Sequence, residues 1–353
     1  MPQRQTIARI INDPFSTDGD SSNTVITDFD ASARNGAILH SVRCEIHLTT
    51  SSYATTEANY VAPLFGAIEQ MSVSVDSKQA FNVTSAGYIP ISGSDTSSAN
   101  SLGHVVSVSR AMGGSYNFLQ SDTTASTAIQ YCYFDVPLNI RVNGSVRIDV
   151  NMVLDAMDDF VQGEAGQGTI ASTMRFSLVW VDSADVSPKS VMAARHIDAL
   201  AAGGTSTESF RIPQGHLGKK LVIIPLEDGG TDYLPTALDT GEVSIRDGTG
   251  NVLNQVRGIQ LGLQTASNHG SLSWDTAATA LRGSSVVYTN SNVYEIDLAG
   301  VTGAFDVELT NGATQCDYFY YVTTYEPING SSGPAATQVE RVKSDSASKQ
   351  ANI

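Results

Sequence analysis

Basic residues are scarce in this chain. It has 20 lysines and arginines, of which only six are lysines, against 36 aspartates and glutamates, and its formal net charge is −16. Binding to nucleic-acid phosphates needs lysines and arginines gathered in one groove, so this scarcity argues against specific nucleic-acid binding. Aspartates outnumber glutamates about two to one, a composition that fits either salty surroundings or simply a well-solvated surface.

Cysteines and long apolar runs are also few. Cys44, Cys132 and Cys316 are far apart and odd in number, which argues against a disulfide framework or a CxxC metal cluster. Each lies in a strand-like run, so we expect three buried thiols. The start, MPQRQTIARIINDPF, has no apolar core of the kind found in signal peptides, and no stretch approaches the roughly 18 apolar residues of a spanning helix. We therefore expect neither a secretion signal nor a membrane-spanning helix.

Catalytic motifs are absent from the sequence. It contains no GxSxG, HExxH, P-loop or strand-linked GxGxxG pattern, and its six histidines are scattered. Five carboxylates alternate along expected strands, at Glu242, Glu295, Asp297, Asp306 and Glu308. This spacing is typical of an outward polar face, whereas a glycosidase needs two carboxylates facing each other across a cleft. We expect no enzymatic activity and no cofactor.

The densest acidic cluster is LDAMDDF, which contains Asp155, Asp158 and Asp159. Three carboxylates on one loop offer the hard oxygen ligands that Ca²⁺ prefers. Their spacing does not match an EF-hand, so a solvated acidic loop is the favoured interpretation and a Ca²⁺ site is the alternative.

The sequence is rich in period-two alternation of apolar and polar residues, bounded by Gly, Ser, Asn, Asp and Pro. Strand-like runs form one set at 37–48, 70–83, 129–140, 145–154 and 174–182, and a second set at 208–213, 219–227, 241–263, 284–298, 304–309 and 316–327. Tight turns are expected at Asp76–Lys78 and Arg246–Asn251, where Asp and Gly tolerate positive φ. The pattern predicts an all-β chain made of two successive antiparallel sandwiches.

The segment between the two sets predicts a connecting helix over 187–204. Ser187 is a candidate N-cap, Pro188 suits the first helical position and Gly203 follows the expected end. The resulting division is an N-terminal arm at 1–35, a first sandwich at 36–186, the helix, a second sandwich at 205–328 and a C-terminal tail at 329–353.

The two sets share a repeated pattern. FDVPLNIRVNGSVRIDVNM at 134–152 matches YEIDLAGVTGAFDVELTNG at 294–312 when Gly144 is aligned with Gly303. The aligned apolar positions are Val146, Ile148 and Val150 against Phe305, Val307 and Leu309. An aromatic strand follows in both sets, at 175–182 and 317–327. We interpret this as structural duplication of a β-hairpin; the alternative is that all amphipathic hairpins look alike because the pleat forces alternation.

The expected N-terminal arm carries a short basic and apolar segment, RQTIARII. It holds Arg4 and Arg9 beside Ile7, Ile10 and Ile11. Such a segment can contact an anionic lipid surface, a nucleic acid or a neighbouring subunit. Two charges contribute only about 2 kcal/mol at a membrane surface, so the segment would act in many copies or hardly at all.

Four features of the sequence point to one family. They are the two successive strand sets, the repeated pattern at 134–152 and 294–312, the aromatic strand after each repeat and the polar arms. Together they resemble a double jelly-roll major capsid protein. This family belongs to tailless icosahedral viruses, many with an internal membrane, and includes relatives of the adenovirus hexon. The resemblance covers about residues 36–328 and concerns architecture, with no diagnostic sequence signature.

The resemblance implies a structural virion protein, made in the host cytoplasm, that forms homotrimers. Two jelly rolls per subunit would give each trimer a six-sided outline that tiles an icosahedral shell. Implied partners are neighbouring capsomers, penton or minor capsid proteins and, through the N-terminal segment, an internal lipid membrane. Long loops at 82–103 and 263–283 would form the outer towers.

Two other functions fit the same strand pattern, because fold does not fix function. One is a viral spike or other surface-binding β-sandwich protein. The other is a carbohydrate-active module. Fibrous repeats or a signal peptide would favour a spike or adhesin, and a cleft lined by carboxylates and aromatics would favour the module.

Overall fold

The computed structural model describes most of the chain. The described residues are 3–12, 22–51, 59–60, 68–84, 103–123, 127–153, 161–162, 169–181, 187–227, 237–262, 293–299 and 301–327. The acidic cluster Asp155, Asp158 and Asp159 lies outside them, as do the C-terminal tail and almost all of both expected tower loops. No helix among the described residues is long and apolar enough to cross a membrane.

Eleven strands and one α-helix are described in the first half of the chain. The strands are β1 (Gln3–Asn12), β2 (Ser22–Asp30), β3 (Ile38–Ser51), β4 (Asn59–Tyr60), β5 (Ile68–Val75), β6 (Lys78–Thr84), β7 (Tyr116–Thr123), β8 (Thr127–Arg141), β9 (Ser145–Val153), β10 (Val161–Gln162) and β11 (Thr169–Val181). The helix is α1 (Gly103–Ala111), and a 3-10 turn, η1, spans Ser32–Arg34. One sheet has the order β1-β11-β3-β8-β7 and the other β2-β9-β5-β6, while β4 and β10 form a separate pair.

The second half contains eight described strands. They are β12 (Lys189–Leu200), β13 (Thr205–Arg211), β14 (Leu217–Glu227), β15 (Glu242–Asp247), β16 (Val252–Arg257), β17 (Tyr294–Asp297), β18 (Ala304–Thr310) and β19 (Cys316–Tyr325). Their sheets have the orders β12-β19-β14-β17 and β13-β18-β15-β16. All pairings are antiparallel.

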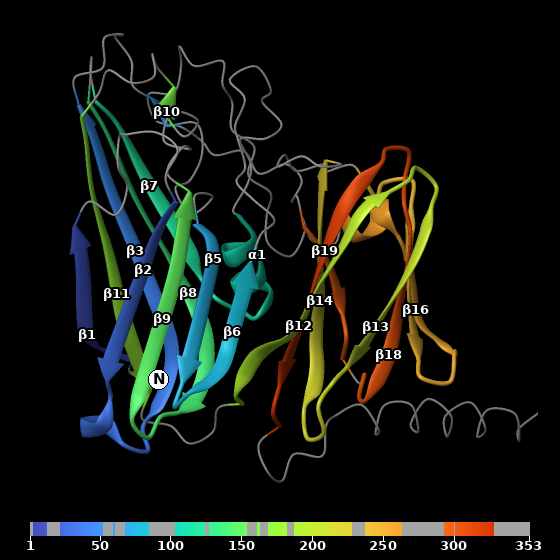
Figure 1. Cartoon of the computed structure of the whole chain (residues 1–353), viewed down its shortest axis with the longest axis horizontal. Coiled ribbons are helices and arrows are strands. Elements are labelled where there is room, and N and C mark those ends of the chain that lie inside the picture. Colours follow the sequence, from blue (N-terminus) through green and yellow to red (C-terminus); the bar gives the residue numbers. More distant parts are fainter. Residues whose placement is uncertain are drawn as a thin grey trace, which may run out of the picture.

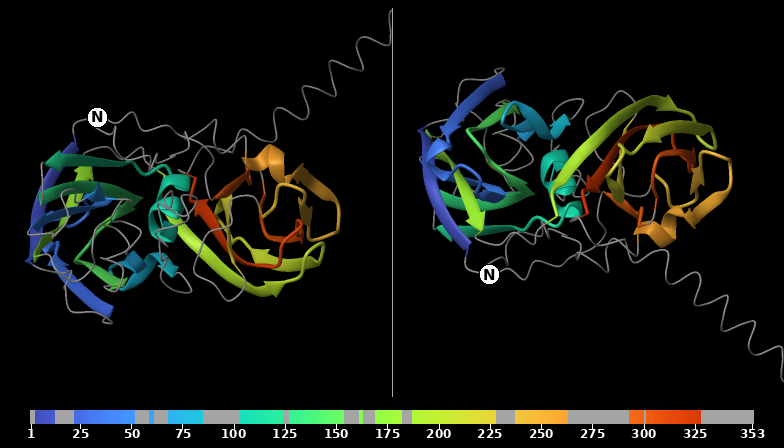
Figure 2. Two further views of the ribbon diagram at one scale, coloured as in Figure 1. Left: turned by 90° about the horizontal axis from the view of Figure 1, so that it is seen from above. Right: turned by 90° about the horizontal axis from the view of Figure 1, so that it is seen from below.

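The two halves have the same topology. The strands β12 to β19 can be matched in order with eight strands of the first half, namely β1, β2, β3, β5, β6, β8, β9 and β11. Both sheet orders are then identical, apart from the extra edge strand β7 and the small pair β4 and β10. Each half is therefore one eight-stranded jelly roll, in which two sheets pack face to face. The rolls stand side by side with their strands roughly upright (Figure 1), and each is a sandwich when seen end-on (Figure 2).

The repeated sequence pattern falls on equivalent strands. β8 and β9 carry the first copy and β17 and β18 the second. The aligned positions are all buried: Val146, Ile148 and Val150 in one roll and Phe305, Val307 and Leu309 in the other. One detail differs from the expectation, because β8 and β9 belong to opposite sheets. The repeat is a corner that crosses between sheets and is not a hairpin.

The expected tight turns are present. Asp76 and Ser77 have φ of 49° and 65° between β5 and β6, the positive values that a two-residue type I′ turn requires. The Asp76 carboxylate also accepts backbone N–H bonds from Asn143, Gly144 and Ser145 at 2.7, 2.8 and 3.1 Å, which ties this turn to the β8–β9 corner. Although partial burial raises it, these bonds hold the pKa of Asp76 below its ordinary value.

The prediction of an N-terminal arm at 1–35 is wrong for the residues that the structure describes in this range. β1 pairs with β11 from Gln3 to Asn12, and β2 pairs with β9 from Ser22 to Asp30. Along β2, Val25, Thr27 and Phe29 are buried while the residues between them are exposed. The sequence of β2 shows this alternation, although the polar stretch at 13–21 that precedes it favours an arm. The first jelly roll therefore begins at β1.

The connecting helix predicted over 187–204 is also wrong, because this segment contains strand β12. Its backbone pairs with β19, and pairing with a partner strand overrides the local helix preference. Register shifts between Val191 and Ala193 and between Ile197 and Leu200 change the face that the strand presents. Val191 packs on the first core, whereas Ile197 and Leu200 pack on the second. These bulges interrupt the period-two alternation of side chains that marks a strand.

Candidate functional site

The two jelly rolls meet at a buried junction, which we define as α1 together with the strands that pack on it from each roll. α1 contacts β5, β6 and β8 of the first roll and β14 and β19 of the second, and it lies between the two sandwiches (Figure 2). All nine of its residues are buried. The helix was not predicted from the sequence, because its valine-rich stretch GHVVSVSRA has weak helix propensity.

Apolar packing at the junction comes from strands that are buried on both faces. Along β14, Leu221 and Ile223 belong to the core of the second roll, whereas Val222 and Ile224 belong to a core continuous with the first roll. β19 behaves in the same way, and its Tyr321 points to the junction. Burial on both faces explains why these strands read as unbroken apolar runs. The two rolls therefore share one core cluster.

An ion-pair network crosses the junction. Glu295 of β17 lies 3.5 Å from Arg110 of α1 and accepts a 2.5 Å bond from Lys220 of β14. The side chains of Arg110 and Glu295 are only 5% and 3% exposed. Lys219 donates to the carbonyl oxygen of Met112, just beyond the helix end, where unpaired carbonyls attract cations. Burial and the nearby Lys189 and Lys220 lower the pKa of Lys219 to about 8.

A second polar chain joins the rolls through His104. Tyr321 of β19 donates to the carbonyl oxygen of Thr84 in β6 at 2.6 Å. Because its proton is used there, the Tyr321 hydroxyl accepts from His104 Nδ1, 3.0 Å away. Burial, together with the charge of His196, lowers the pKa of His104 to about 3. The imidazole is therefore neutral, and it fixes α1 against both rolls.

α1 is also held on the first roll by hydrogen bonds and close packing. Asp135 of β8 accepts from Arg43 at 2.7 and 2.8 Å and from Ser115 at 2.6 Å, and its carbonyl oxygen accepts from Ser109 of α1 at 2.5 Å. The turn after the helix runs so close to β8 that a Cβ on Gly114 would overlap this carbonyl oxygen. These contacts and those of Glu295 and His104 make the junction a rigid connection.

The expected contact residues of the N-terminal segment lie on β1, an edge strand of the described sheet. Arg9 is exposed and Ile10 is 63% exposed, whereas Ile11 packs against the first core. For Arg4 and Ile7 the structure describes only the backbone, with Arg4 opposite Trp180. The structure thus places all five residues on one strand and presents Arg9 and Ile10 to the outside.

An open groove of about 590 Å³ lies beside Ile10 on the outer face of this sheet. Its lining includes Glu45, Tyr131 and Arg175. Glu45 lies 3.4 Å from Arg175 and accepts a 3.0 Å bond from the Tyr131 hydroxyl. The groove thus combines a paired Glu45–Arg175 network with the exposed apolar side chain of Ile10.

All three cysteines are buried, as expected, and none of them forms a disulfide. Burial, with the nearby Cys132, raises the pKa of Cys44 well above its ordinary value, so its unreactive thiol form is favoured.

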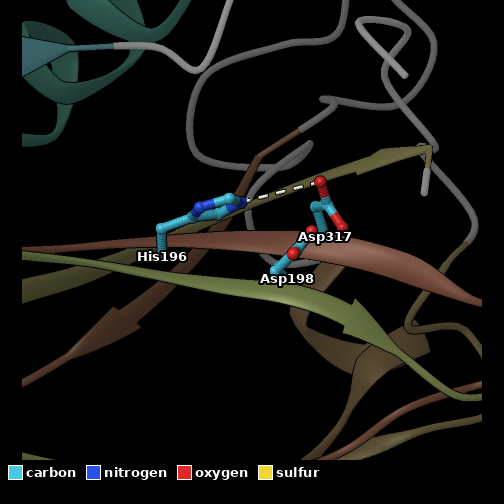
Figure 3. Close-up of side chains that lie close together, drawn as sticks. All are labelled: His196, Asp198 and Asp317. Atoms are coloured by element: carbon cyan, nitrogen blue, oxygen red, sulfur yellow. Dashed lines mark ion pairs between the residues drawn. The ribbon is translucent and has the colours of Figure 1, made fainter. Parts of the chain in front are cut away.

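One cluster of metal-ligating side chains was not predicted from the sequence. His196 and Asp198 on β12 meet Asp317 on β19, and their ligand atoms all lie within 4.8 Å of one another (Figure 3). Once β12 is read as a strand, the i, i+2 spacing places His196 and Asp198 on one face. In the helix predicted over 187–204, the same two residues would lie on different faces.

Comparison with known proteins identifies the fold. No protein-family model matches the sequence, and no curated protein matches it. Among solved structures, the STIV MCP matches with a TM-score of 0.53 at 10% identity, over 91% of this chain and 96% of that chain. The atomic structure of Sulfolobus Turreted Icosahedral Virus contains a chain that matches with a TM-score of 0.56 at 10% identity, over 92% of this chain and 91% of that chain. This likeness in fold spans both jelly rolls and confirms the expected double jelly-roll architecture.

Proposed function

We propose that this chain is the major capsid subunit of an icosahedral virus and that it forms trimers. The observation that carries the proposal is the pair of topologically identical jelly rolls, fixed side by side by a buried junction. Three such subunits around a threefold axis present six similar lobes. A six-lobed unit packs on a hexagonal lattice, which is the tiling that a large closed shell needs.

The rigidity of the junction supports this function. A shell subunit must hold its two lobes at a constant angle, because every copy repeats the same lateral contacts. Ordinary interdomain interfaces permit relative motion unless they are large and apolar. Here a shared apolar core, the Arg110–Glu295–Lys220 network and the His104–Tyr321–Thr84 chain all oppose such motion. Function would then reside in surface complementarity and not in catalysis.

The exposed edge of β1 is our candidate for contact with a neighbouring subunit. Unpaired strand edges associate readily with other chains, and Ile10 adds an exposed apolar side chain beside Arg9. In the virion, Arg4 and Ile7 on the same strand would extend this contact. Neighbouring capsomers, penton or minor capsid proteins and an internal membrane are the partners proposed for the shell as a whole.

Electron microscopy of the purified full-length protein tests the proposal. We expect six-sided particles or closed shells. Single two-lobed particles at every protein concentration would contradict it. The role of β1 is tested with Ile10→Asp, which should leave the fold intact and weaken assembly. Ile26→Asp on β2, where the isoleucine is 55% exposed, is the matched control. Equal effects of the two substitutions would remove the role assigned to β1.

A further inference from the structure

We propose that His196, Asp198 and Asp317 form a binding site for a divalent transition-metal ion, with zinc(II) as the best match. The three side chains converge from β12 and β19, and their ligand atoms lie within 4.8 Å of one another. His196 and Asp317 face each other in Figure 3, with the Asp198 carboxylate beside Asp317. One imidazole nitrogen and two carboxylate oxygens suit zinc better than the all-oxygen ions Ca²⁺ and Mg²⁺.

The distance between His196 Nε2 and Asp317 Oδ2 points to a shared ion. It is 3.6 Å, which is too long for a hydrogen bond. Two ligands bound tetrahedrally to one zinc ion, at the usual Zn–N and Zn–O lengths, lie about 3.4 Å apart. The pair is therefore already spaced as two ligands of one ion.

Asp317 needs a positive partner at this place. Its side chain is only 7% exposed, and a buried carboxylate is unfavourable unless it is paired. One oxygen, Oδ1, accepts the backbone N–H of Ala199 at 2.7 Å. The other faces His196, and no lysine or arginine among the described residues forms an ion pair with Asp317 or Asp198. A bound cation would neutralise both carboxylates.

The local backbone holds the three ligands together. The register shift between Ile197 and Leu200 makes β12 bulge over β19, and Ala199 has a φ of 51°, which is strained for alanine. His196 stacks on Phe319 with ring centroids 4.3 Å apart and an interplanar angle of 15°. The imidazole is thus oriented by packing before any ion binds. Water would complete the coordination, because His196 and Asp198 are exposed.

The site lies beside the junction, which gives it a structural role. Phe319 contacts both His196 and His104 of α1, with a ring-centroid distance of 4.9 Å to His104. An ion that joins β12 to β19 would fix the edge strand that faces the first roll, since β12 also contacts β6 and β8. Binding to the folded state alone would raise the unfolding temperature.

Zinc titration of the metal-stripped, full-length protein tests the site, with isothermal calorimetry for affinity and cobalt(II) absorption for the ligand set. We expect one ion per chain and a higher thermal midpoint with zinc. Removing a group that only orients a metal ligand weakens metal binding about 10–100-fold, and removing the ligand itself should weaken it at least as much. His196→Gln, Asp198→Asn and Asp317→Asn should therefore each weaken binding at least tenfold and abolish the thermal shift. Asp317→Asn keeps an oxygen for the Ala199 N–H.

The controls are His216→Gln and Asp297→Asn in the same jelly roll. His216 pairs with Glu326 at 3.0 Å, and Asp297 is an exposed carboxylate. Both variants should bind zinc as the unmodified protein does. Absence of saturable binding to the unmodified protein, or unchanged affinity in the three site variants, would overturn the proposal. The measurement does not depend on assembly, so it is independent of the capsid function.

Discussion

Arg110 of α1 and Glu295 of β17 form an ion pair that joins the two jelly rolls across 185 positions of sequence. Both side chains are almost fully buried, and Lys220 supplies a second cation to the same carboxylate. A buried pair of this kind favours one arrangement of the rolls, because a shift that broke the pair within the packed junction would leave a buried charge without its partner.

Glu295→Gln should destabilise the protein by about 3–5 kcal/mol, because it leaves two cations at the junction without their carboxylate. Chemical denaturation measures the change. The control is Glu308→Gln, since Glu308 pairs with Arg246 at 3.3 Å with both side chains about one-third exposed, and such pairs contribute about 0–1 kcal/mol. Similar losses in the two variants would show that the Glu295 network does not hold the junction.

Stability should fall as the pH is lowered from about 6.5 toward 3, through the buried His104. In the unfolded chain this imidazole binds a proton near the ordinary histidine pKa of 6.5, whereas burial in the folded protein lowers its pKa to about 3. Between these values the unfolded state binds more protons, so acidification favours unfolding. His104→Gln should therefore lose less stability than the unmodified protein across this range in denaturant melts at several pH values. Parallel pH profiles would contradict a neutral His104.

The equivalence of the two rolls predicts equivalent effects of buried charge. Ile148→Asp in β9 and Val307→Asp in β18 should each cost at least about 4 kcal/mol, since both positions are buried in matching strands. Ile26→Asp, at an exposed position of β2, should change stability by less than about 1 kcal/mol. Denaturant melts compare the three variants. Retained stability of Ile148→Asp would show that the wrong face of β9 has been placed inside.

Deletion of residues 1–35 should unfold the first jelly roll, because it removes β1 and β2 and exposes the edges of β11 and β9. Near-ultraviolet circular dichroism and limited proteolysis would detect this loss. Deletion of residues 329–353, which removes none of the described strands, is the control. A truncated protein with an unchanged melting curve would mean that β1 and β2 are dispensable, as an arm would be.

Much of the fold was predictable because alternation is imposed by the pleat. The strand sets, the turns at Asp76 and Asp247 and the equivalence of Ile148 with Val307 follow from local pattern alone. The strand conformation of β12 does not follow from local pattern, because its pairing with β19 is long-range and its bulges break the period-two alternation. The sequence contains one sign of the side-by-side packing of the rolls, which is the unbroken apolar run of β14. Only burial on both faces explains such a run.

The site residues were less accessible from sequence. Glu295 reads as one member of an alternating polar face, yet the neighbouring roll buries it against α1. The approach of Asp317 to His196 depends on the register of two strands more than 100 residues apart. Such pairings are set by tertiary packing, which no local pattern encodes.

The molar mass of the purified protein in solution tests the central claim most directly. The subunit has a mass of 37.3 kDa, and the account predicts a trimer of three times that mass, about 112 kDa, by light scattering, or larger shells built from it. A mass of one subunit at every concentration and salt condition would contradict the proposed capsid function.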